Sequence, residues 1–499
     1  MTSGARRDCM IVLLGLVVAA GIARVLVDQP ALAIMGVVAG TLALAFVVLP
    51  LPFDRIVLVC LGIVLIGYAF FGRAFAYLRV GPLFIGEVVL CLGLLGVLTH
   101  RKRGAALQSP LGWLLIVYMC WGAACTIPYL GTYGTMALRD AVLWGYGWFA
   151  IMVLTLMRRS RWLALVPELY GRWFPRLLLW IPLGLLFTRA ADRYLPIDHG
   201  DSAPLDFVKA GDAGVHLAGI AVFVALGLYS GRTSLMSTSR QGFPWFVWAL
   251  WSLGFAFVAS INRGGLLAVV TAMSVIVALR PVEIAPRIIR GMGVAGCLAI
   301  GLIVFDFSLD VGRGRTISPR QVAMNSLSIS GHGGASELEG TRRWRLTWWE
   351  EIVAYTVGGD YFWTGKGFGI NLADDDGFQL SSGTLRSPHN GHVTVLARTG
   401  VPGIILWGAL QIGYGVSLVA SGRRARRRGD ERWSRLTFWV LAYWMAALVN
   451  SSFDVYLEGP QGGIWFWCVF GLGLALMDTE KLRQVKSSPV ITRAYAGAA

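Results

Sequence analysis

The residue types best suited to chemistry in this sequence lie in one polar stretch, residues 387–403. It contains Pro388-His389-Asn390 and closes the longest polar interval of the chain. A neutral histidine can accept a hydroxyl proton near neutral pH, as general-base catalysis requires. A single histidine in a loop is more often structural. His389 therefore indicates a catalytic site only where other residues of the chain support that role.

Three arginines are the candidates for binding an anion. Arg263 stands between two apolar runs, where an arginine is costly unless it reaches the membrane surface, pairs with an acid or meets an anionic ligand. A planar guanidinium suits phosphate, and Gly264 and Gly265 would let a ligand approach closely. Arg342 and Arg345 are three residues apart and share one face of a predicted helix, which serves either a solvated surface or a diphosphate.

Other patterns resemble metal or nucleotide sites but lack the required spacing. His389 and His392 have no third ligand nearby in the sequence, and residues 374–376 lack the spacing of a calcium loop. Residues 365–369 lack the spacing of a phosphate loop and are interpreted as a glycine turn. None of the seven cysteines lies in the large polar interval, so we expect no disulfide framework. We predict no metal site and no cofactor.

The composition places these residues in a membrane protein. The chain has 499 residues, of which 56% are hydrophobic and 14% are charged, and its mean hydropathy is +0.62. A soluble protein carries about 25% charged residues, so this deficit and the repeated apolar runs predict an all-α polytopic membrane protein. We expect about 12–14 transmembrane helices and one large extracytoplasmic loop containing short helices.

The predicted spans follow from the apolar runs. In chain order they are residues 9–27, 31–50, 55–72, 82–99, 111–128, 140–157, 174–188, 212–230, 244–260, 265–280, 289–307, 400–420, 436–450 and 462–477. The first run follows two arginines like a signal peptide but has no clear cleavage site, so we interpret it as a retained helix.

The distribution of charge predicts the orientation. The net charge is +16, and the basic clusters are short and flank the apolar runs, which is the positive-inside pattern and argues against nucleic-acid binding. Such clusters attract anionic membrane lipids. The pattern places loops such as residues 158–173 in the cytoplasm and residues 308–399 outside.

Four regions are therefore expected. They are an N-terminal helix bundle (residues 1–307), a large periplasmic loop carrying the candidate motif (residues 308–399), C-terminal transmembrane helices (residues 400–478) and a cytoplasmic tail (residues 479–499). Within the large loop, residues 341–357 are predicted to form a helix with Trp344, Trp348 and Ile352 on one face.

Several motifs follow one another through the second half of the chain. They are Ser260-x-Asn262-Arg263-Gly264, Arg342-x-x-Arg345-x-x-x-Trp349, Gly365-x-Gly367-x-Gly369 and Pro388-His389-Asn390-x-His392-(x)7-Gly400-x-x-Gly403. In combination they resemble the bacterial O-antigen ligase and O-antigen polymerase superfamily of membrane glycosyltransferases. That family commonly has an aromatic residue at the position of His392, so we expect His392 to pack rather than catalyse.

The resemblance implies transfer of a glycan from undecaprenyl diphosphate to an acceptor hydroxyl, without a nucleotide or an obligatory metal. The acceptor is another glycan in a polymerase, and lipid A-core or a protein hydroxyl in a ligase. Membrane lipids are further partners, and the implied location is the bacterial inner membrane with the active site facing the periplasm. The implied site residues are His389 as the catalytic residue, Arg263, Arg345 and Arg342 as diphosphate-binding residues, and Asn390, Asn262 and Gly367 as supporting residues.

Two other classes of function are weighed against this prediction. A transporter or flippase of lipid-linked glycans would spread charged residues along the spans and show an internal repeat. A membrane scaffold would depend on no single outward residue. The polar candidates instead gather on the predicted outer side, which favours the transferase.

Overall fold

The computed structural model of the protein describes residues 53–99, 108–158, 160–194, 207–229, 243–310, 316–329, 336–380, 383 and 385–486. The predicted spans at residues 9–27 and 31–50, and residues 487–499 of the predicted tail, lie outside this part of the chain.

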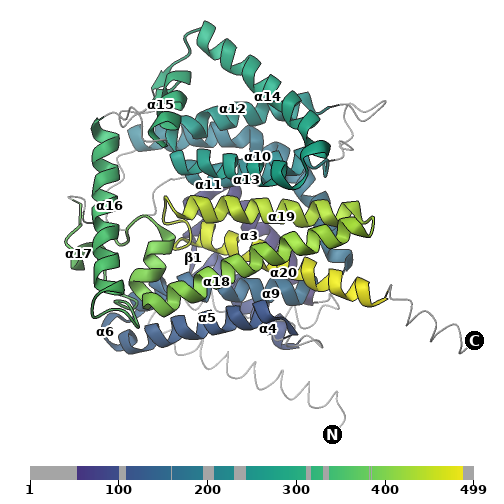
Figure 1. The fold of residues 1–499 in the computed structure, drawn as a ribbon. Helices are drawn as coiled ribbons and strands as arrows, with labels where there is room; N and C mark the ends of the chain where they lie inside the picture. Colours follow the sequence, from purple (N-terminus) through teal and green to yellow (C-terminus); the bar gives the residue numbers. More distant parts are fainter. Residues whose placement is uncertain are drawn as a thin grey trace, which may run out of the picture.

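The described chain consists almost entirely of helices (Figure 1). The longer helices are α3 (Phe53–Ala76), α4 (Ile85–Thr99), α5 (Pro110–Thr126), α9 (Gly147–Met157), α10 (Ser160–Tyr194), α11 (Ala210–Ala225), α12 (Trp245–Ile261), α13 (Arg263–Leu279), α14 (Pro281–Val304), α15 (Pro319–Ile329), α16 (Ser336–Val357), α18 (Gly391–Arg427), α19 (Glu431–Ser451) and α20 (Pro460–Lys486). The shorter ones are η2 (Ile127–Tyr129), α6 (Leu130–Tyr133), α7 (Thr135–Asp140), α8 (Val142–Gly145) and α17 (Leu372–Asp375). Strand β1 (Arg79–Val80) pairs antiparallel with β2 (Leu83–Phe84), and β3 (Leu309–Asp310) with β4 (Thr316–Ile317).

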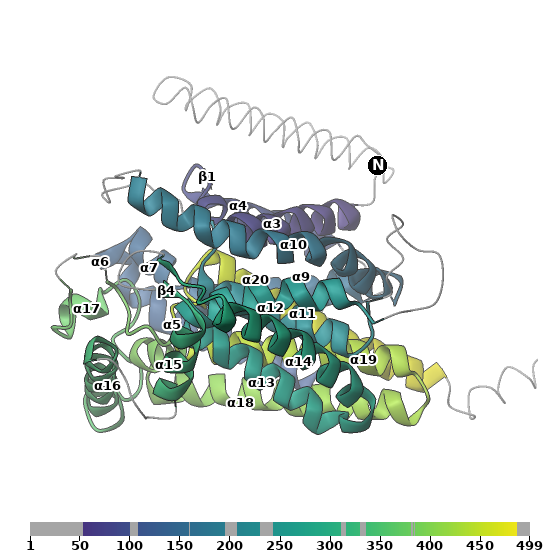
Figure 2. The same ribbon diagram turned by 90° about the horizontal axis from the view of Figure 1, so that it is seen from above.

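The long apolar helices lie side by side in one bundle, and α16 crosses one end of it (Figures 1 and 2). Within the bundle, α11, α13 and α19 pack against one another. Gly214 of α11 and Gly265 of α13 meet so closely that a Cβ on Gly214 would clash with the backbone of Gly265. Small residues permit such close approach of two membrane helices. This crossing brings the N-terminal ends of α11 and α13 together.

The chain is an all-α polytopic membrane protein. Five described helices are long and apolar enough to cross a membrane, or six if the bent pair Thr135–Gly145 and Gly147–Met157 is one span. Four shorter helices, α4, α11, α12 and α13, are also apolar. The expected total of spans and the predicted orientation stay predictions.

Every predicted span within the described residues overlaps helical structure, but several boundaries differ. Helix α14 begins at Pro281 rather than at residue 289, and α20 continues to Lys486, past the expected start of the tail at residue 479. Residues 158–173 were expected to form a loop, whereas α10 is helical from Ser160 to Tyr194 despite three internal prolines. The predicted helix 341–357 begins earlier, at Ser336. The expected boundary at residue 400 falls inside α18, which begins at Gly391 and is kinked at Gly400, where φ is 66°.

Candidate active site

His389 lies in a short turn directly before α18, and its backbone is left-handed with φ of 55°. This conformation is uncommon for a residue with a side chain and persists only where its surroundings hold it. Asn390 begins the helix: its side-chain oxygen accepts the backbone N–H groups of His392 at 3.0 Å and Val393 at 3.2 Å. Helix capping therefore explains the asparagine that follows the histidine.

Charged side chains from separate parts of the chain surround the imidazole of His389. Burial is the main cause that lowers the pKa of His389 to about 4, followed by the positive charges of Arg345, Lys209 and Arg73, while Asp454 opposes the shift. The side chain is therefore a neutral imidazole at physiological pH. A neutral ring can accept a proton, as a general base must.

Arg345 joins α16 to the loop between α19 and α20. Its guanidinium Nη1 donates to the backbone oxygen of Phe453 over 3.2 Å, next to Asp454. Arg342, one turn earlier on the same face, is exposed. The structure thus places Arg345 near His389, whereas Arg342 lies at the exposed surface.

Arg263 lies at the start of α13, where Asn262 caps the helix by accepting the N–H of Gly265 at 2.8 Å. Its guanidinium contacts the Ser328 hydroxyl at 3.4 Å and lies close enough to that of Arg342 for the two charges to repel. Neighbouring cations such as these are costly without an anion between them. The structure therefore brings two of the three predicted anion-binding arginines, Arg263 and Arg342, near one another.

The turn that carries Arg263 is held by a residue of the large loop. The side-chain nitrogen of Asn325, in α15, donates to the backbone oxygens of Ala259 and Ser260, both at 2.8 Å. These are carbonyls at the C-terminal end of α12, which have no partner within the helix. Asn325 thereby fixes the end of α12 from which the Arg263 turn departs.

Sequence reasoning missed three charged residues around His389. Lys209, directly before α11, pairs with Asp454 at a distance of 2.6 Å between its Nζ and the carboxylate. Although burial raises the pKa of Asp454, the charge of Lys209 prevails and lowers it below the usual value. Arg73 lies in the last turn of α3. All three sit at helix ends or in short loops, where the sequence shows no distinctive spacing.

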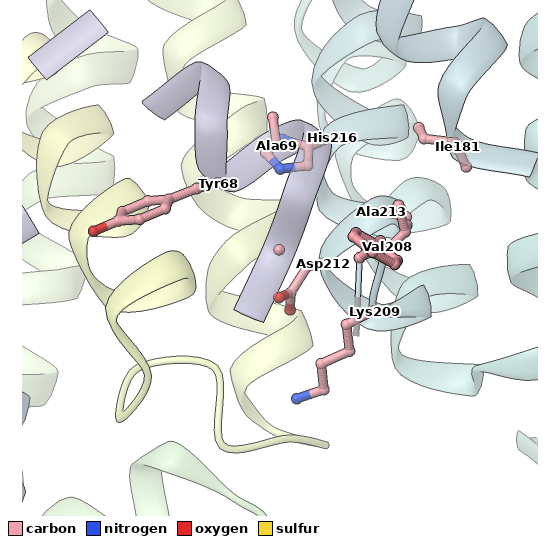
Figure 3. A pocket seen from close by; sticks show the side chains of 10 residues that line it. Tyr68, Ala69, Ile181, Val208, Lys209, Asp212, Ala213 and His216 are labelled. Carbon is pink, nitrogen blue, oxygen red and sulfur yellow. The ribbon is translucent and has the colours of Figure 1, made fainter. Parts of the chain in front are cut away.

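Two buried polar features adjoin this cluster. Lys209 and Asp212 help to line a pocket that also contains His216 (Figure 3). Asn450 is fully buried near Gly211 and Gly264, and within the described part of the chain neither atom of its amide group has a hydrogen-bond partner. A buried amide in that state can bind a polar group of a ligand or a water molecule.

The glycine-rich turn at residues 365–369 is fixed by contacts with other parts of the fold. All three of its glycines have positive φ, and a Cβ on Gly367 would clash with the ring of Tyr129. The Gly367 carbonyl accepts a hydrogen bond from buried Arg398 at 3.1 Å. Lys366 pairs with Asp375 and Asp376, both at 2.5 Å, so this lysine and these carboxylates neutralise one another. Gly367 is thus a structural support.

His392 packs as expected. Its Nδ1 accepts the indole N–H of Trp407 at 3.0 Å, and its Nε2 lies 3.2 Å from the backbone oxygen of Leu448. Both ring nitrogens are occupied, so the two histidines of the motif have different surroundings. Among the described residues, no three His, Cys, Asp or Glu side chains gather in a way that could hold a metal ion.

A comparison with protein families matches residues 248–408 to the family described as O-antigen ligase. The matched segment contains all of the site residues predicted from the sequence, and ends before Asp454. A comparison with curated proteins found no match.

Proposed function

We propose, from the premise that this chain belongs to the O-antigen ligase and O-antigen polymerase superfamily, that it transfers a polyprenyl-diphosphate-linked glycan to an acceptor hydroxyl. The observation that carries the proposal is the gathering of three cationic side chains from three parts of the chain around the neutral imidazole of His389. Such a set can bind an anionic leaving group beside a base.

In the proposed reaction, the acceptor oxygen attacks the anomeric carbon of the reducing-end sugar. His389 accepts the proton of that hydroxyl as the new carbon–oxygen bond forms. The bond between the anomeric carbon and the phosphate oxygen breaks, and its electron pair leaves with the lipid diphosphate. Holding both large substrates in place supplies much of the rate, because it makes the step effectively unimolecular.

The arginines and Lys209 would stabilise the charge that develops on the diphosphate. Arg345 and Arg73 lie near His389, and Arg263 and Arg342 form a second pair of cations. Preorganised donors that face developing charge are a major source of catalysis. Guanidinium groups can serve here in the place that a metal ion takes in other phosphate-releasing enzymes, which supports a metal-independent transfer.

The remaining parts of the proposal rest on the family and on the charge pattern of the sequence. The donor lipid is undecaprenyl diphosphate, and the site opens to the periplasmic face of the inner membrane. The acceptor is either another repeat unit or lipid A-core. Single repeat units left on the lipid in a deletion strain would identify a polymerase, and long chains left on it would identify a ligase.

The decisive experiment uses the full-length protein in liposomes with a lipid-diphosphate-linked glycan and an acceptor glycan. We expect wild-type protein to produce free lipid diphosphate and transferred glycan, and His389→Ala protein to produce neither while it remains folded in the membrane. Wild-type activity in the His389→Ala protein would refute the catalytic assignment. Movement of the lipid-linked glycan across the bilayer without transfer would favour the flippase instead.

A further inference from the structure

Glu458 contacts residues on both sides of the turn that carries His389. It lies in the loop between α19 and α20, four residues after Asp454. Its carboxylate accepts a hydrogen bond from the Thr394 hydroxyl at 2.8 Å and another from the Ser387 hydroxyl. Ser387 and Thr394 are 2% and 0% exposed, so the hydroxyl partners of the half-buried Glu458 are shielded from water.

The two hydroxyl partners flank His389 in the sequence. Ser387 is two residues before the histidine, and Thr394 is in the first turn of α18. One carboxylate therefore links both arms of the turn whose central residue is left-handed. A strained backbone persists only when several contacts hold it, and this bridge supplies two of them.

A charged network keeps Glu458 in place. Burial raises the pKa of Glu458, while the nearby charge of Arg398 and the two hydroxyl bonds favour its ionised form. Arg398 is itself fixed: it pairs with Asp140 at 3.0 Å and bonds to the Gly367 carbonyl. The carboxylate is thus connected to the glycine-rich turn and, through Asp140, to the end of α7.

We propose that Glu458 is a positioning residue that holds the His389 turn in its reactive conformation, so that the α19–α20 loop supports the site with two carboxylates. Asp454 lies near the imidazole of His389, and Glu458 contacts residues on both sides of His389 in the sequence. This inference rests on the proposed function, because it assigns Glu458 a role in presenting His389 to the acceptor hydroxyl. Glu458 itself does not contact the reacting atoms.

The test compares Glu458→Ala and Glu458→Gln in the full-length protein, with transfer kinetics measured in liposomes. Loss of the bridge would let the turn relax, and misplacement of a catalytic group by 1 Å costs on the order of 100-fold in rate. We expect kcat of Glu458→Ala to fall by one to two orders of magnitude with KM little changed. Glu458→Gln should recover most of this loss, because its amide oxygen can still accept from Thr394. Glu350→Ala, which removes an exposed carboxylate of α16, is the matched control.

A second readout separates positioning from general structural support. Burial of the imidazole lowers the pKa of His389 to about 4. If the imidazole moves toward solvent in Glu458→Ala, this pKa should rise toward that of an ordinary histidine. The acid limb of the pH profile, which is the low-pH range where kcat/KM falls, should then move upward from about pH 4. An unchanged kcat in Glu458→Ala would overturn the inference.

The outcomes also distinguish this inference from the proposed function. Full activity of His389→Ala would refute the function itself, whereas full activity of Glu458→Ala together with an inactive His389→Ala would refute only the positioning role. If Glu458→Ala fails to fold, Ser387→Ala and Thr394→Val each remove one of its hydrogen bonds. A loss of kcat with the same shift of the acid limb is expected for both, and unchanged kinetics in both would overturn the inference.

Discussion

The indole N–H of Trp349 donates to the backbone oxygen of Pro388 over 2.9 Å. This bond ties α16, the helix that crosses the end of the bundle, to the residue directly before His389. The same helix presents Arg345, so one element places both an anion-binding candidate and the turn that carries the proposed base. The relationship explains why an aromatic residue follows the two arginines in the motif at residues 342–349.

Removal of this hydrogen bond should slow transfer. Trp349→Phe keeps an aromatic ring but no donor, and we expect kcat to fall about fivefold, because one hydrogen bond contributes about 1 kcal/mol. Initial rates of glycan transfer provide the measurement. Trp363→Phe changes an exposed indole of the same loop and should leave kcat unaltered. Equal rates for both variants would show that the bond to Pro388 has no part in catalysis.

The pH dependence of kcat/KM should reflect the low pKa of His389. A base acts in its neutral form, so activity is lost as the pH falls through the pKa of the free enzyme. Because that pKa is about 4, kcat/KM should stay level when the pH is lowered from neutrality to about pH 5 and fall below it. Arg345→Gln removes a positive charge and should move the limb to higher pH. Asp454→Asn should move it the opposite way. A limb near pH 6.5 in the wild-type protein would contradict the buried, cation-surrounded imidazole.

Conservative replacement of the site arginines should weaken donor binding. Arg345→Lys and Arg263→Lys keep the charge but lose the planar, two-pronged donor that matches phosphate. We expect KM for the lipid-linked donor to rise about tenfold in each, since a hydrogen bond to a charged group contributes about 1.5 kcal/mol or more. Arg343→Lys, at an exposed position of the same helix, is the control. Wild-type KM in both variants would indicate that these arginines serve the membrane surface rather than a diphosphate.

The two glycines at positions 367 and 377 allow packing to be separated from backbone strain. Both have positive φ, but a Cβ would clash with Tyr129 only at position 367, while position 377 has open space. Alanine at either position costs about 1–2 kcal/mol for the left-handed backbone. Gly367→Ala should lose about 1–3 kcal/mol more from overpacking. Thermal unfolding of the two variants in detergent measures the difference, and equal transition temperatures would mean that Tyr129 moves aside freely.

The sequence by itself determined the class of the fold and the centre of the candidate site. A lipid environment requires few charged residues and long apolar segments. The all-helical membrane architecture can therefore be predicted from the composition and from the repeated apolar runs. His389 and the arginines were candidates because polar residues at the ends of apolar runs are few, and the family resemblance then implied their roles. The packing of His392 likewise follows from the motif, whereas the capping role of Asn390 was shown by the structure.

Only the tertiary structure decided which residues surround His389. Lys209, Arg73, Asp454 and Glu458 come from three regions of the chain that are distant in sequence, and each occupies a helix end or a short loop without a distinctive spacing. Their meeting depends on how the ends of α3 and α11 and the α19–α20 loop pack beneath α16. Electrostatic interaction depends on distance in space and on burial, and a single sequence encodes neither directly.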